Sequence, residues 1–118
     1  MRFIKYWLPV LACMGFIFYV SSVPGSNIPP LFPFQDIVFH LAAYLALGLS
    51  FSRALKNSYS NITLSQVIVF TIIFGTIYGM SDELHQAFVP YRTVSGFDVF
   101  TDGVGTFLGA IIRPFIKI

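Results

Sequence analysis

The residues that could do chemistry gather at one end of a set of apolar segments. They are carboxylates, a histidine, an amide, an arginine and a serine, namely Asp36, His40, Asp82, Glu83, Gln86, Arg92, Ser95, Asp98 and Asp102. Carboxylates beside a histidine can accept hydrogen bonds from a ligand, relay protons, or act as general base and acid. The sequence therefore predicts a polar pocket for a ligand that is cationic or rich in hydrogen-bond donors.

Three apolar segments carry these residues along single helical faces, because the spacing of 0, 4, 7 and 11 residues keeps side chains on one side. The faces are Asp36, His40, Ala43 and Leu47; Gly75, Gly79, Asp82 and Gln86; and Asp98, Asp102, Gly105 and Gly109. Glycines four residues apart let helix backbones approach closely in a membrane. These four glycines therefore predict helix packing, and they direct the acidic residues toward the inside of a bundle.

The composition indicates a membrane protein. The 118 residues are 56% hydrophobic and 10% charged, whereas charged residues make up roughly 25% of an average globular domain. Most basic residues fall at the opposite end of the segments from the acids: Arg2, Lys5, Arg53, Lys56, Arg113 and Lys117. Basic residues mark the cytoplasmic side, so we expect cytoplasmic N and C termini and an outward-facing pocket. This charge separation excludes nucleic-acid binding as the reason for the net charge of +2.

The predicted fold is an all-α membrane protein, a four-helix transmembrane bundle forming a single domain over residues 1–118. We expect helices over residues 3–20, 36–55, 64–85 and 98–112, outer loops over 21–35 and 86–97, and an inner loop over 56–63. The prolines of the first outer loop block a helix there. The first apolar run continues past Cys13 to Val20, which predicts an uncleaved helix, and a lone cysteine supports no disulfide framework.

The order of these motifs resembles the VanZ-like family. The resemblance rests on the run Ser81, Asp82, Glu83, Leu84, His85 and Gln86, followed by Arg92, Ser95, Asp98, Asp102 and Gly105. Two further matches are Ser22, Val23 and Pro24 in the first outer loop, and the spacing of Asp36, His40 and Tyr44. Two positions depart from the family pattern: Ile37 replaces a frequent basic residue, and Asp102 stands where asparagine is expected. Both departures make the predicted pocket more acidic.

The resemblance implies a multi-pass protein of the bacterial cytoplasmic membrane that acts at the cell envelope. The family is similar to the accessory protein associated with low-level teicoplanin resistance in Gram-positive bacteria. The expected partners are therefore the lipid bilayer and a glycopeptide, a cell-wall precursor or a lipid headgroup. Because the resemblance implies no reaction, a binding protein is favoured over an enzyme.

A membrane-embedded hydrolase is one alternative. The spacing of Arg92, Asp98 and Asp102 resembles a lipid phosphatase signature, but an aspartate occupies the position of the nucleophilic histidine. A phosphate dianion requires several cations or a metal, whereas the predicted pocket holds one arginine among five acids. A proton relay is another alternative, although no second charged layer continues it through the span.

Neither a metal nor a cofactor is expected from the sequence. His40 and His85 fall on different helices, and neither has a second histidine four residues further on. A purely structural role is the remaining alternative. In that case His40 pairs with Asp36, Arg92 pairs with Asp98 or Glu83, and the cluster holds the outer loops in shape.

Overall fold

The described part of the chain forms four α-helices that run alternately in opposite directions. The computed structural model describes residues 2–92 and 95–116. The helices are α1 (Arg2–Ser21), α2 (Gln35–Ser58), α3 (Leu64–Gln86) and α4 (Gly96–Ile112), with short 3-10 helices η1 (Gly25–Asn27) and η2 (Arg113–Phe115). No strand occurs within these two described ranges, so the predicted all-α fold is confirmed.

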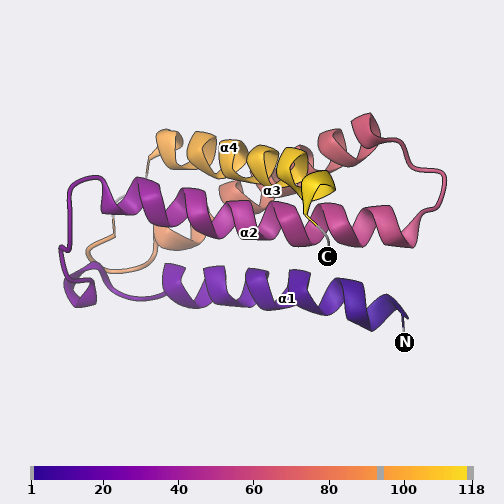
Figure 1. The fold of residues 1–118 in the computed structure, drawn as a ribbon. Helices are drawn as coiled ribbons and strands as arrows, with labels where there is room; N and C mark the ends of the chain where they lie inside the picture. Colours follow the sequence, from indigo (N-terminus) through magenta and orange to yellow (C-terminus); the bar gives the residue numbers. More distant parts are fainter. Residues whose placement is uncertain (1, 93–94, 117–118) are drawn as a thin grey trace.

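Both long connections lie at one end of the molecule, on the left in Figure 1, and the α2–α3 turn lies at the other. The alternating helix directions place Lys5, Arg53, Lys56 and Arg113 toward the end with the α2–α3 turn. All five acidic residues belong to the halves of α2, α3 and α4 that adjoin the long connections. The predicted charge separation therefore holds along the described helices. The side chain of Arg2 and the whole of Lys117 lie outside the part that the structure describes.

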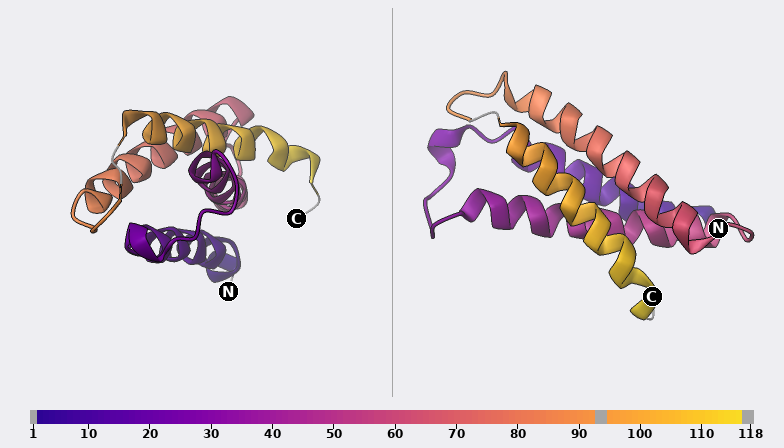
Figure 2. Two further views of the ribbon diagram at one scale, coloured as in Figure 1. Left: turned by 90° about the vertical axis from the view of Figure 1, so that its left-hand side faces the viewer. Right: turned by 90° about the horizontal axis from the view of Figure 1, so that it is seen from above.

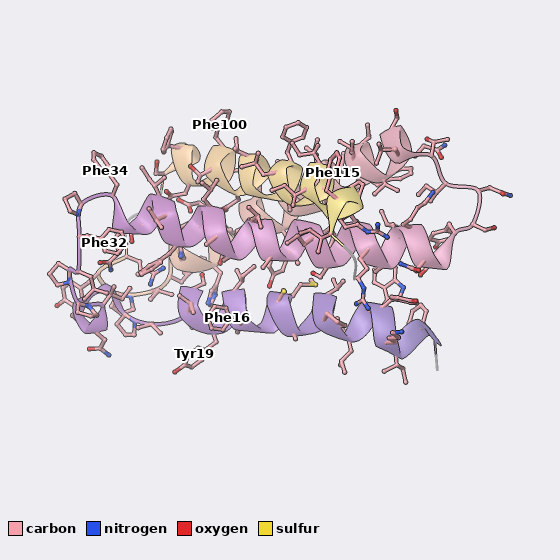
Figure 3. All side chains as sticks on the ribbon, in the orientation of Figure 1. Phe16, Tyr19, Phe32, Phe34, Phe100 and Phe115 are labelled. Atoms are coloured by element: carbon pink, nitrogen blue, oxygen red, sulfur yellow. The ribbon has the colours of Figure 1, made fainter. Side chains whose placement is uncertain are left out.

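Three helices are long and apolar enough to cross a bilayer: Phe3–Ser21, Gln35–Ser58 and Leu64–Gln86. α4 has only 17 residues, whereas a span usually needs about 20. Figure 3 shows Tyr19 and Phe100 projecting away from the helices, and the side chains of Phe16, Tyr19, Phe100 and Phe115 are all largely exposed. Such a surface is unsuited to water and suited to lipid.

Specific residues begin and end the helices. Thr63 and Gln66 form a reciprocal capping box at the start of α3, which satisfies two backbone donors. α2 ends at Ser58, three residues beyond its predicted end at 55. The extension is stabilised because Asn57 Nδ2 donates to the Arg53 carbonyl at 2.8 Å and Trp7 Nε1 donates to Ser58 Oγ at 2.8 Å.

α2 and α3 each contact the other three helices, and α2 has the more extensive contacts of the two, so it is the central element. α4 crosses α2 and α3 obliquely, as the right-hand view of Figure 2 shows. α1 packs against α2 and α3 but makes no contact with α4. The buried apolar core comprises Val10, Ile17, Tyr44, Leu47 and Ala54. The crossing of α2, α3 and α4 thus brings the three predicted polar faces together. α1 covers α2 from the other side.

Candidate functional site

Side chains from three helices meet in the half of the bundle that carries the acids. His40 on α2, Asp82 on α3 and Asp102 on α4 each place one ring nitrogen or carboxylate oxygen within 4.8 Å of the others. His40 Nδ1 lies 2.7 Å from Asp102 Oδ1, a short hydrogen bond from the imidazole to the carboxylate. We call these three residues the His–Asp–Asp cluster. The structural alternative predicted that His40 pairs with Asp36. This pairing is wrong, because the crossing of α4 over α2 puts Asp102 opposite the imidazole.

Glycines make the close approach of α4 possible. A Cβ atom on Gly79 of α3 would lie 2.8 Å from Asp102 Oδ2, and one on Gly105 of α4 would lie 2.8 Å from the Leu41 carbonyl oxygen of α2. A Cβ atom on Gly75 would overlap the Thr106 side chain, and one on Gly109 would overlap the Leu45 carbonyl. All four predicted packing glycines thus lie where α4 meets α2 or α3.

The cluster is buried, and its charge is incompletely balanced. Asp102 is 0% exposed and Asp82 is 7% exposed. Tyr44 donates a hydrogen bond of 3.2 Å to Asp82 Oδ2, whereas Asp102 Oδ2 has no hydrogen-bond partner in the described part of the chain. Among residues 2–92 and 95–116, neither carboxylate forms an ion pair with lysine or arginine. Burying two carboxylates costs several kcal/mol in free energy unless a counter-charge is present; here that counter-charge is at most one imidazolium.

Glu83 and Ser95 tie α3 to the start of α4. The Ser95 backbone N–H donates to Glu83 Oε1, and Ser95 Oγ accepts from the Phe97 N–H at 3.1 Å. This second bond caps α4 at its N-terminus. Both residues were predicted to face a ligand, and in the structure their described hydrogen bonds position the connection between two helices.

Arg92 ties the second long connection to α1. Its Nη1 donates to the carbonyls of Val20 at 3.3 Å and Val23 at 3.1 Å. These carbonyls adjoin the C-terminus of α1, where a cation is electrostatically favourable. Within the described chain, Arg92 forms no ion pair with Asp98 or Glu83. The pairing that the structural alternative expected for Arg92 is therefore wrong.

His85 lies apart from the cluster. Its ring stacks on Phe18 of α1 with a centroid separation of 4.6 Å, and its Nε2 lies 2.8 Å from Ser22 Oγ. The two histidines therefore do not share a site.

A cavity of about 720 Å³ opens between α1 and α2. Its polar wall is formed by Asp36, His40, Asp82, Gln86 and Arg92. Its apolar wall is formed mainly by Ala12, Phe16, Ile17, Val20, Ala43 and Ala46. Glu83, Ser95, Asp98 and Asp102 were expected around the same pocket but are not among the lining residues. Asp98 instead lines a second hollow of about 570 Å³, beneath the two long connections.

The apolar wall of the cavity was missed by the sequence analysis. α1 has no polar face, so nothing in its sequence distinguishes cavity-lining residues from lipid-facing ones. Gln35 was also missed, although its side chain accepts from Leu31 N at 2.6 Å and donates to the Pro29 carbonyl at 3.0 Å. A glutamine just after a proline-rich loop, at the start of a helix, was the available signal.

The fold and site define a helical membrane protein with a buried His–Asp–Asp cluster beside a largely apolar cavity. The chain belongs to the VanZ/LLP1 family, whose model matches residues 6–117. This match confirms the resemblance drawn from the motifs. No curated protein and no solved structure matches the chain.

Proposed function

We propose that this chain binds a lipid or a lipid-linked cell-wall precursor in the bacterial cytoplasmic membrane. The polar part of the ligand contacts Asp36, His40, Asp82 and Gln86, and its apolar part lies between α1 and α2. One observation carries the proposal: a single cavity has a polar wall at one end and an apolar wall along α1 and α2. Its volume is within the roughly 300 to 1,000 Å³ of sites that enclose small ligands.

We further propose that all four helices cross the bilayer as one domain, with both termini cytoplasmic. The charge separation supports this orientation, because basic residues are retained on the cytoplasmic side. η2 continues directly from α4 to Phe115, which lengthens the short fourth helix. In this orientation the cavity opens toward the outer face, where cell-wall precursors are used.

The polar wall favours a headgroup that donates hydrogen bonds, such as an amine or a cluster of hydroxyl groups. Asp36 and Asp82 contribute carboxylate acceptors, and Gln86 contributes an amide. Arg92 is held by the carbonyls of Val20 and Val23 and also lines the cavity. A whole glycopeptide contacts at most the rim of such a cavity, so a role in teicoplanin resistance would act through a bound precursor.

Mass spectrometry of lipids that co-purify with the full chain in mild detergent tests this function. We expect one headgroup class to be enriched several-fold over the membrane extract. Ala43→Phe fills the apolar wall and should abolish the enrichment. Ala87→Phe introduces the same side chain at an exposed position outside both cavities and should preserve it. Lipids in the same proportions as the extract, or equal retention by the two variants, would contradict the proposal.

The His40–Asp102 hydrogen bond favours a second function, a membrane-embedded hydrolase. Asp102 would orient the imidazole, and His40, which lines the cavity, would act as general base toward a water molecule. Hydrolysis of a lipid-linked headgroup should then follow a bell-shaped pH profile and be lost in His40→Ala. Unchanged turnover in His40→Ala would exclude this function and leave binding intact.

A further inference from the structure

The His–Asp–Asp cluster has the composition of a divalent cation site. It contributes one imidazole nitrogen and two carboxylate oxygens, from three different helices, all within 4.8 Å of one another. Three protein ligands with an open position for water or substrate are typical of catalytic and substrate-binding metal sites. A sequence search for histidines four residues apart on one helix could not find this arrangement.

An unsatisfied oxygen provides a second, independent indication. Asp102 is fully buried, and its Oδ2 has no hydrogen-bond partner within residues 2–92 and 95–116. This oxygen faces α3, because a Cβ atom on Gly79 would lie 2.8 Å from it, and Gly79 precedes Asp82 by one turn on the same helix. Buried polar atoms are nearly always satisfied by a partner. Asp102 Oδ2 therefore lies against α3 about one turn from Asp82, and a cation bound beside both carboxylates would satisfy it.

Charge balance leads to the same conclusion. Two carboxylates lie in an apolar interior, and within the described ranges their one ionic partner is His40. If the imidazole is neutral, as a metal ligand must be, the cluster carries two negative charges, which one divalent cation balances.

We infer that His40, Asp82 and Asp102 bind one divalent cation of the kind that accepts mixed nitrogen and oxygen ligands, such as Zn²⁺ or Mn²⁺. His40 and Asp82 also line the cavity between α1 and α2, so the open coordination position faces it. The bound ion would attract an anionic group of a ligand, such as a phosphate, to an otherwise acidic wall. This inference does not depend on the proposed lipid ligand.

The test uses the full chain in detergent, purified with a tag that contains no histidine and then treated with a chelator. Zn²⁺, Mn²⁺ and Mg²⁺ are added separately, and the bound metal per chain is measured by elemental analysis. We expect one ion per chain for Zn²⁺ or Mn²⁺ and a higher unfolding temperature in its presence. Asp82→Asn and His40→Gln should each weaken binding by at least about 100-fold.

His85→Gln is the matched control, because it removes the histidine that stacks on Phe18 outside the cluster. It should bind the metal as the wild type does. The absorption spectrum of the wild-type chain with Co²⁺ is a second measurement, and it does not require any variant to fold. We expect absorption bands of bound Co²⁺ that disappear when Zn²⁺ displaces the ion. A metal content far below one per chain for every cation would overturn the inference. So would equal losses in His85→Gln and His40→Gln.

Discussion

Asp102 Oδ2 lies against Gly79, at a distance of 2.8 Å from the position that a Cβ atom on this glycine would occupy. The Asp102 carboxylate of α4 can therefore occupy this position because Gly79 of α3 has no side chain. About one turn further along α3, Asp82 belongs to the same cluster as Asp102. Packing and chemistry are thus coupled at this contact, and a change at Gly79 should affect both.

Gly79→Ala should destabilise the fold and displace Asp102 from His40. Its methyl group would lie about 3 Å from two further atoms of Asp102 (Cβ at 2.9 Å, Cγ at 3.3 Å), and overpacking of this kind typically costs about 1 to 3 kcal/mol. Thermal unfolding in detergent measures the effect.

Gly15→Ala is the control for this substitution, since nothing lies within 4 Å of its added Cβ. In the middle of α1, alanine should stabilise the helix by up to about 1 kcal/mol. Equal unfolding temperatures for the two variants would show that the α3–α4 contact is looser than the structure indicates.

The hydrogen bond between His40 and Asp102 should appear as a coupling energy. The cycle combines His40→Ala and Asp102→Ala, and the free energy of unfolding is measured in mixed micelles. We expect a coupling free energy of about 1 to 3 kcal/mol. The matched cycle of His85→Ala with Asp102→Ala should give less than about 0.5 kcal/mol, because His85 contacts α1 instead. If the two cycles gave comparable coupling energies, the coupling between His40 and Asp102 could not be attributed to their hydrogen bond.

The helices could be predicted from the sequence because their ends have local causes. Apolar runs of spanning length delimit α1, α2 and α3, with prolines between α1 and α2 and after α3, and a polar turn between α2 and α3. Each observed helix end lies within three residues of its prediction. The larger differences come from side-chain contacts. Ser95 caps α4 and starts it at Gly96 instead of Asp98, and Trp7 of α1 binds Ser58 and lengthens α2.

The pairing within the site could not be predicted in the same way. Helical periodicity assigns His40, Asp82 and Asp102 to faces, but the crossing of α4 decides which faces meet and at what height. A local rule therefore selected Asp36 as the partner of His40, and the tertiary contact with Asp102 prevails. The structural alternative likewise paired Arg92 with a carboxylate, whereas the long connection brings Arg92 to the carbonyls of Val20 and Val23.

Arg92→Ala should loosen the end of the molecule that carries the cavity. The substitution removes the donors to the Val20 and Val23 carbonyls, so backbone amides around the C-terminus of α1 should exchange faster with deuterium. Hydrogen exchange with mass spectrometry measures the change. Lys56→Ala is the control, because Lys56 donates to the Ile62 carbonyl at the opposite end. It should accelerate exchange only near the α2–α3 turn, and faster exchange near Val20 in this control would contradict the assignment.

The orientation in the membrane can be tested by single cysteines. In a Cys13→Ala background, Asn27→Cys introduces a thiol in the exposed η1 segment, and Ser60→Cys introduces one in the exposed α2–α3 turn. Because the basic residues lie toward the end that contains this turn, we expect a membrane-impermeant maleimide to label Asn27→Cys on intact cells. Ser60→Cys should be labelled only after the membrane is opened. The reverse pattern would place the cavity on the cytoplasmic side and would exclude a ligand taken from the outer face. Labelling of both cysteines on intact cells would contradict the proposed span of α2.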